Sequence, residues 1–194
     1  MLIQFLQKNK FVRSIIYKTG NLRGKDIIGK IQSFVSTKDS ILDIGSGGCN
    51  ICEILSKRGY KITPLDVQDF SFVDNMKPVI YDGNKIPFDD DKFDKALILF
   101  VLHHTPEPEE IIREAKRVSK RIIIMEDIYS NWLHKYVTYF FDSLLNLEFA
   151  GNPRTNKNDK QWKKTFEKLG LRLIDAKYNR PFLVFNHATY YLEK

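Results

Sequence analysis

The chain has few cysteines, no long apolar stretch and no long run of like charge. Only two of its 194 residues are cysteine, Cys49 and Cys52. Such low cysteine content fits a reducing, intracellular setting rather than a secreted, disulfide-rich one. Polar residues interrupt the apolar N-terminus, residues 1–8, too early for a cleavable signal, and no apolar run is long enough to span a bilayer. These absences predict a cytoplasmic protein.

The two cysteines have Cys-x-x-Cys spacing, which occurs in redox and metal sites. The sequence offers no second cysteine pair to complete a metal site, and Cys49 falls inside a glycine-rich loop. We therefore expect neither thiol chemistry nor a bound metal.

The formal net charge of +7 comes from 31 basic and 24 acidic side chains. Such an excess favours anionic partners, for example nucleic acid or an anionic membrane surface. The lysines are scattered, however, and a solvated lysine-rich surface is the simpler interpretation. A length of 194 residues with 43% hydrophobic content predicts one globular domain with a proper core.

The most informative stretch is residues 40–50, Ser-Ile-Leu-Asp-Ile-Gly-Ser-Gly-Gly-Cys-Asn. Its apolar first half, which includes Asp43, predicts a strand buried on both faces of a parallel sheet. The glycines that follow, beginning with Gly45 and Gly47, allow backbone angles closed to other residues. They also let a ligand approach the main chain closely.

A helix is expected directly after this loop, over about residues 51–58, with Gly59 ending it. Asn50 or Ser46 would cap its N-terminus. A strand, a glycine turn and a helix N-terminus in succession predict a nucleotide-type binding loop.

The rest of the chain alternates apolar strands with helices, which predicts an α/β fold with an open parallel sheet covered on both faces. Further strands are expected at residues 61–67, 78–81, 95–101, 121–125, 171–178 and 187–192, and further helices at 107–118 and 159–169. The last two strands follow one another closely, so we expect them to pair antiparallel at one edge.

Polar residues stand at the carboxyl ends of these strands, where open α/β sheets bind their ligands. They are Asp66, Asp82, His103, Glu126 and Asp127. Asp66 lies about 20 positions after the first loop glycine, the spacing at which nucleotide folds place a ribose-binding carboxylate.

Two segments outside this core have helical patterns. Residues 1–19 predict one or two amphipathic helices, and another helix is expected to start near residue 23. They are expected to cover a sheet edge, to form a lid, or to present a surface-seeking helix with Lys8, Lys10 and Arg13 on its polar face. Residues 131–149 predict a helix that is apolar over more than half its surface.

These motifs, in this order, resemble the class I S-adenosylmethionine-dependent methyltransferases, specifically the small type-11 group. The family pattern Asp-x-Gly-x-Gly-x-Gly is matched by Asp43, Gly45 and Gly47, with Cys49 replacing the third glycine. We expect this departure to be tolerated because the position already leads into the helix. The further matches are Asp66, Asp82–Phe88, Phe93-Asp94 and Leu102-His103-His104.

The resemblance implies S-adenosyl-L-methionine as cofactor and a Rossmann-like sheet ordered 3-2-1-4-5-7-6 with the seventh strand antiparallel. Asp66 would hold the ribose hydroxyls, and Asp82 would face the adenine amino group. The amides of residues 45–47 and the helix N-terminus suit the cofactor carboxylate. The predicted cofactor-binding residues are Asp43, Gly45, Ser46, Gly47, Asp66, Val67, Asp82, Gly83 and Phe100.

We expect one methyltransferase domain over residues 1–194. Its predicted parts are N-terminal helices that could form a lid (1–36), a cofactor-binding core (37–127), a helical cap insertion (128–160), and a C-terminal helix with a strand pair (161–194). An apolar cap of this kind suits a small-molecule or lipid-like acceptor.

The acceptor is less well specified than the donor. Residues 100–103 read Phe-Val-Leu-His, without the Asn/Asp-Pro-Pro-Tyr motif of base N-methyltransferases, and no catalytic cysteine follows that strand. His103 could act as a general base, and Glu126 could bind an amine or accept its proton. The alternatives are an RNA methyltransferase that uses the basic surface and a non-catalytic module that binds the cofactor. Peripheral contact with a membrane is compatible with a small-molecule acceptor and with a lipid-like one.

Overall fold

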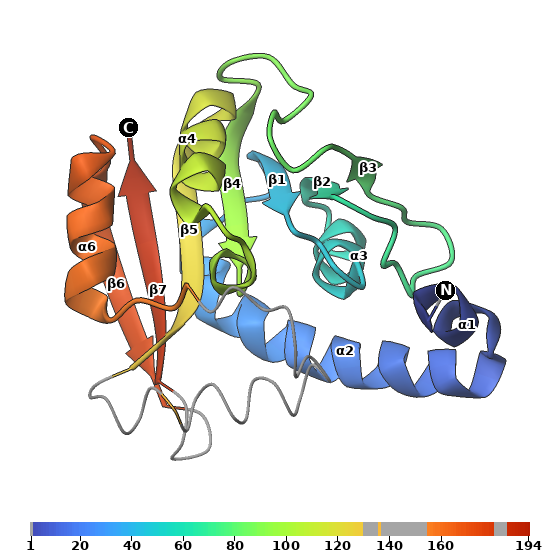
Figure 1. Cartoon of the computed structure of the whole chain (residues 1–194). Coiled ribbons are helices and arrows are strands. Elements are labelled where there is room, and N and C mark those ends of the chain that lie inside the picture. Colours follow the sequence, from blue (N-terminus) through green and yellow to red (C-terminus); the bar gives the residue numbers. More distant parts are fainter. Residues whose placement is uncertain (1, 130–135, 137–154, 181–185) are drawn as a thin grey trace.

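The computed structural model describes residues 2–129, 136, 155–180 and 186–194. Within them seven strands form one sheet in the order β3-β2-β1-β4-β5-β7-β6, which confirms the predicted α/β topology (Figure 1). The strands are β1 (Ser40–Ile44), β2 (Lys61–Asp66), β3 (Val79–Ile80), β4 (Phe93–Leu99), β5 (Ser119–Ile128), β6 (Arg172–Asn179) and β7 (Asn186–Glu193). β7 runs antiparallel to both of its neighbours, and the remaining pairs are parallel.

The strand register places the glycine loop after β1 and Asp66 of β2 at the same level, at the carboxyl edge of the sheet. Ile44, the last residue of β1, pairs with Leu65 of β2 and with Ile98 of β4. The loop that starts at Gly45 and the carboxylate of Asp66 therefore emerge side by side. This alignment follows from parallel pairing, because parallel strands end at the same edge.

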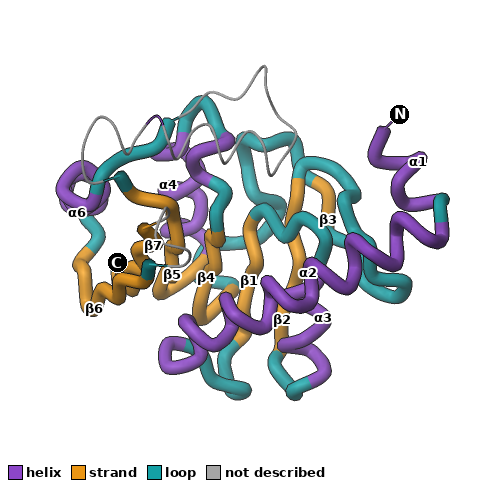
Figure 2. Tube along the Cα trace, turned by 90° about the horizontal axis from the view of Figure 1, so that it is seen from below, coloured by secondary structure: helices purple, strands orange, loops and turns teal. Residues whose placement is uncertain are grey.

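Helices cover both faces of the sheet (Figure 2). They are α1 (Leu2–Lys8), α2 (Lys10–Ile31), α3 (Asn50–Lys57), α4 (Pro108–Val118) and α6 (Asp159–Lys168). On one face Ile28 of α2 and Leu55 of α3 pack in one core, and on the other Ile112 of α4 and Trp162 of α6 pack in a second. Each core uses alternate side chains of the central strands, which are apolar on both faces as predicted.

The N-terminal helices differ from the prediction, since α2 is continuous from Lys10 to Ile31 and no new helix starts near residue 23. Gly20 and Gly24, near the predicted helix start, are sites of close helix packing. A Cβ atom on Gly20 would lie 2.5 Å from Oδ1 of Asn50, and one on Gly24 would lie 3.2 Å from Cδ1 of Ile54. Glycine therefore allows α2 to approach α3.

Several strand boundaries also differ. β4 starts and ends two residues earlier than predicted, and β5 continues through Glu126 and Asp127 to Ile128. β5 is long because antiparallel β7 pairs with it as far as Ile128 opposite Asn186. The predicted apolar helix 131–149 lies outside the described residues, Tyr136 apart. In the described part of the chain, no helix is both long and apolar enough to cross a membrane.

Candidate active site

The glycine loop between β1 and α3 takes left-handed backbone angles at three alternate residues. The angle φ is 74° at Gly45, 49° at Gly47 and 60° at Cys49. Gly45 also lies against the turn after β4, because a Cβ atom there would be 2.5 Å from Cγ2 of Val101. Around Gly47, no atom of the described residues lies within 4 Å of such a Cβ position. The loop is therefore closed toward β4 and open at Gly47.

Cys49 leads directly into α3, as expected, but it does so in a left-handed conformation that favours glycine. It caps α3 with φ 60° and ψ 11° and does not have helical angles. The left-handed conformation costs a residue with a side chain about 1–2 kcal/mol. The side chain is fully buried, with Sγ 3.7 Å from Oγ of Ser46, and this packing offsets part of the strain.

The loop amides are bonded within the protein. Gly45 N and Ser46 N both donate to the carbonyl oxygen of Leu65, at 2.8 and 3.1 Å, and Gly47 N donates to Oδ2 of Asp66 at 2.8 Å. In this arrangement the amides tie the loop to β2, because buried backbone donors need partners. Their contact with the cofactor carboxylate stays a prediction.

The predicted helix caps are also wrong, because Cys49 is the N-cap and makes no side-chain capping bond. Asn50 is the first helical residue, and its side-chain amide donates to the carbonyl of Tyr17 at 3.2 Å and to Oδ1 of Asn21 at 3.0 Å. It thereby attaches α2 to the glycine loop. Gln7 of α1 donates to two carbonyls in the loop after β2.

Asp43 is 2% exposed and accepts a hydrogen bond from the thiol of Cys52, at 3.1 Å. Burial raises the pKa of this carboxyl to about 7. Burial likewise raises the thiol pKa of Cys49, and more strongly that of Cys52. High thiol pKa values disfavour nucleophilic chemistry, so both cysteines pack the loop.

Asp66 and Val67, at the end of β2, come together with Gly83 from the segment after β3. Asp66 is nearly buried, which raises its carboxyl pKa, and its oxygens accept from Gly47 N and from Val67 N at 2.8 Å each. Val67 is 53% exposed. Gly83 has φ 85°, and a Cβ atom there would lie 3.5 Å from Cγ1 of Val67. The carboxylate of Asp66 thus lies beside the accessible apolar surface of Val67.

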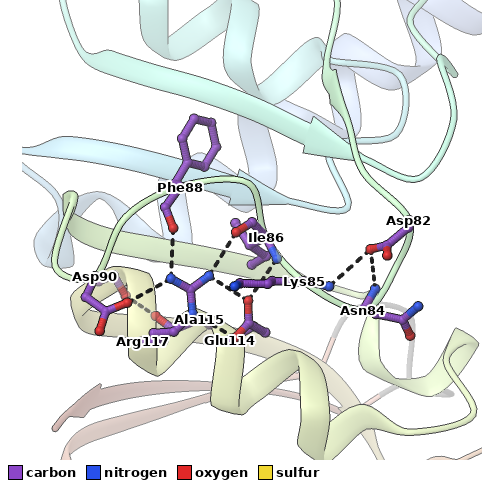
Figure 3. A network of polar contacts seen from close by, with 10 residues as sticks. Asp82, Asn84, Lys85, Ile86, Phe88, Asp90, Glu114, Ala115 and Arg117 are labelled. Atoms are coloured by element: carbon purple, nitrogen blue, oxygen red, sulfur yellow. Dashed lines mark hydrogen bonds and ion pairs between the residues drawn. The ribbon is translucent and has the colours of Figure 1, made fainter.

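The carboxylate of Asp82 is exposed and organises its own turn (Figure 3). Its Oδ1 accepts from the backbone amides of Asn84 at 2.9 Å and Lys85 at 3.1 Å, and these bonds lower the pKa of Asp82. The side chain remains an ionised acceptor, as contact with an amino group requires.

Arg117 of α4, a residue that the sequence analysis missed, anchors the segment that follows Asp82 (Figure 3). Its guanidinium donates to the carbonyls of Ile86 and Phe88, each at 2.8 Å, and also to Glu114. Glu114 in turn accepts from Ile86 N at 2.8 Å. In the sequence Glu114 and Arg117 have the i, i+3 spacing of an ordinary surface ion pair, so only their tertiary contacts identify their role.

Phe100, directly after β4, has the unusual φ of 60° for a non-glycine residue. Its ring packs edge-on against His187 of β7 at 4.8 Å between centroids, and the Arg23 guanidinium of α2 lies 5.1 Å from its centre. His187 Nε2 lies 3.0 Å from Oδ1 of Asp127. Strained residues of this kind concentrate at functional sites. The sequence analysis missed His187, because nothing local links it to β4 or β5.

His103 and Glu126, the predicted catalytic residues, form a buried pair. Nδ1 of His103 lies 2.5 Å from Oε2 of Glu126, and the two side chains are 2% and 0% exposed. Oε1 of Glu126 accepts from the amides of Val101 at 3.0 Å and Leu102 at 2.7 Å. Both Glu126 oxygens are therefore engaged, which suits a residue that orients His103 rather than one that touches an acceptor.

A cavity of about 430 Å³ opens at the carboxyl end of β5. Tyr129, Tyr178 and His187 are among its lining residues, together with Asp159 at the start of α6. It adjoins Phe100, because His187 lines the cavity and packs against the Phe100 ring. Tyrosine, histidine and carboxylate groups around such a space suit a small organic molecule.

The described residues fit S-adenosyl-L-methionine, the cofactor that the resemblance implies. Asp66 retains acceptor capacity beyond its two backbone bonds, which suits ribose hydroxyls. Val67 and Gly83 offer an apolar surface for adenine, and Gly47 leaves the loop open toward the ligand side.

Comparison with known proteins agrees with this geometry. A family model described as "Methyltransferase domain" matches residues 42–122. Among curated proteins, the sterol 4-C-methyltransferase of Caenorhabditis elegans is 27% identical over 124 residues. That match covers 56% of this chain and only 37% of the nematode protein, so the chain spans well under half of this relative.

Solved structures of low sequence identity share the fold. A SAM-dependent methyltransferase from Methanosarcina mazei has a TM-score of 0.66 at 19% identity, covering 84% of this chain and 96% of its own. Magnesium protoporphyrin IX methyltransferase from Synechocystis, solved with bound SAH, also has a TM-score of 0.66, at 12% identity. That match covers 100% of this chain and 98% of the cyanobacterial one.

Proposed function

We propose that the chain is a class I S-adenosylmethionine-dependent methyltransferase of the type-11 group and that it methylates a lipid-like small molecule. The observation that carries this proposal is the hydrogen bond of 2.8 Å from Gly47 N to Asp66. It joins the open glycine loop to the carboxylate at the end of β2, next to Val67. These are the groups that a nucleoside-containing methyl donor requires.

The predicted cofactor residues after β2, β3 and β4 have roles that their surroundings support. Asp66 accepts hydrogen bonds from the ribose hydroxyls, Val67 and Gly83 contact adenine, and Asp82 accepts from its amino group. Phe100 borders the cofactor from the end of β4. The bound cofactor supplies an activated methyl group on a sulfonium, so the protein has mainly to align the acceptor and exclude water.

One observation supports a lipid-like acceptor, because the nematode relative is a sterol methyltransferase. The cavity of about 430 Å³ beside His187 has the size of a small-molecule site. An acceptor of this class would approach the cofactor past Phe100.

For an acceptor that must lose a proton, His103 is the proposed general base and Glu126 its positioning residue. An ionised Glu126 can only accept, so Nδ1 of His103 carries the proton between them and Nε2 is the basic nitrogen. Two backbone amides fix Glu126 and hence the plane of the imidazole. In this arrangement the buried carboxylate of Glu126 orients the base, His103.

The first experiment is isothermal titration of the protein with S-adenosyl-L-methionine and, separately, with NAD. Binding of the former alone is expected, and binding of NAD alone would overturn the proposal. The second is an assay with labelled cofactor against pools of sterols and other lipids, water-soluble small molecules, and RNA. Methylation of RNA only would contradict the acceptor class, and cofactor binding without any transfer would identify a non-catalytic module.

A further inference from the structure

The outer face of α2 exposes three large apolar side chains. Phe11 is 75% exposed, Leu22 70% and Ile15 47%. A helix with 3.6 residues per turn places these positions on one face, along about 16 Å of its length. The adjoining α1 adds Phe5, which is 62% exposed. Single exposed apolar residues are ordinary, but an aligned row on one helix face indicates a surface that something covers.

Lysines accompany this row. Lys18 is on the same face between Ile15 and Leu22, and Lys10 and Lys25 stand at its two ends, all three exposed. None of the three makes an ion pair with any residue in the described ranges. Alternating apolar and cationic groups of this kind match an interface whose inside is apolar and whose surface is anionic.

The opposite face of α2 holds the helix in place. Arg13 was expected on the polar face of a surface-seeking helix, but it pairs with Asp74 and donates to the carbonyl of Phe72. Tyr17 donates to Glu53 of α3 at 2.8 Å. Ile27, which is buried, contributes to the core. The apolar row is therefore presented by a helix that is fixed to the domain.

We infer that the outer face of α2 binds the surface of a lipid bilayer that contains anionic lipids. Phe11, Ile15 and Leu22 enter the boundary between headgroups and acyl chains, and the lysines contact headgroup phosphates. A second copy of the chain fits this face poorly, because a two-fold contact through Lys18 would bring like charges together. The inference goes beyond the proposed function and does not depend on methyl transfer.

Bilayer binding would place the active site close to lipid-like molecules. α2 is also the helix that contacts the glycine loop, through Asn50, and Phe100, through Arg23. When the chain binds a bilayer through α2, the glycine loop and the end of β4 therefore lie next to the helix that contacts the bilayer.

Vesicle flotation tests the inference with the full chain and no cofactor. Phosphatidylcholine vesicles are compared with and without phosphatidylglycerol, at low and high salt. We expect the chain to float with the anionic vesicles and salt to weaken this binding. Each charge neutralisation, Lys18→Gln or Lys25→Gln, is expected to weaken it about fivefold. The triple variant Phe11→Ser, Ile15→Ser, Leu22→Ser is expected to remain in the unbound fraction.

The matched control is Ile174→Ser, which removes an apolar side chain, 42% exposed, from β6 and should leave flotation unchanged. Circular dichroism and cofactor titration check that every variant is folded. Equal binding by the triple variant and the native chain would overturn the inference, as would failure of the native chain to bind anionic vesicles. A native dimer that the triple variant abolishes would also overturn it. A chain that floats but transfers no methyl group would refute only the proposed function.

Discussion

Replacing Glu126 by glutamine would change one buried acceptor into a donor while keeping the shape of the side chain. Oε1 accepts from the amides of Val101 and Leu102, and Oε2 lies 2.5 Å from Nδ1 of His103. Glutamine can keep its oxygen toward the two amides and turn its N–H2 group toward Nδ1. Neutral His103 then carries its proton on Nε2, which can no longer accept one.

The expected effects on stability and on activity are of different size. Glu126→Gln replaces charge-assisted hydrogen bonds by neutral ones, which lowers the free energy of unfolding by about 1–2 kcal/mol. Glu126→Leu would leave two backbone amides and one imidazole nitrogen unpaired, at about 1–3 kcal/mol each. Domains of this kind have about 5–15 kcal/mol in total, so the leucine variant is close to unfolding. Loss of a general base lowers kcat by about 10²–10⁴-fold.

The assay measures kcat and cofactor affinity, with thermal unfolding alongside. For Glu126→Gln we expect a Tm slightly below that of the native chain, unchanged cofactor affinity and a kcat at least about 100-fold lower. A variant with near-native kcat and a lowered Tm would refute the reasoning, because the pair would then only secure the turn after β4.

Three further predictions concern the carboxylates and the anchored loop. Asp66→Ala removes the acceptor bonded to Gly47 N, so affinity for S-adenosyl-L-methionine should fall about 10–100-fold by titration calorimetry. Arg117→Met leaves two loop carbonyls without their donor and should lower the free energy of unfolding by about 2–3 kcal/mol and weaken cofactor binding. Burial raises the pKa of Asp43 from 3.8 to about 7, so the folded chain holds a proton there that the unfolded chain has released. The free energy of unfolding, measured with urea, should therefore fall by about 4 kcal/mol as pH rises from about 4 to 7, and Asp43→Asn should flatten this dependence.

Controls make these predictions separable. Unchanged cofactor affinity in Asp66→Ala would show that the ribose lies elsewhere. Arg113→Met is the matched control for Arg117, since Arg113 is on the same helix and, among the described residues, forms its ion pair with exposed Glu110 alone. It should change stability by less than about 0.5 kcal/mol. Equal losses in both arginine variants would contradict the anchoring role. Unaltered pH dependence in Asp43→Asn would assign the effect to another group.

Much of the fold could be predicted from local sequence. Apolar runs identify the central strands, and glycine after β1 marks the loop, since both patterns reflect short-range backbone and burial requirements. The order and direction of the strands, together with the family, came from the resemblance of the motifs around Asp43, Asp66 and Asp82. Parallel pairing then brings those motifs to one edge, so their proximity was predictable once the order was known.

Other features depend on which distant segments meet. α2 is one helix because Gly20 packs on Asn50, although glycine in a local pattern suggests a break. β5 extends through Glu126 because β7 pairs with it, and the same pairing brings His187 to Asp127. The sequence by itself therefore determined the topology and the predicted donor site. Tertiary packing alone decided which donors and acceptors are already used inside the protein, because hydrogen bonds and close contacts depend on spatial neighbours that no local pattern specifies.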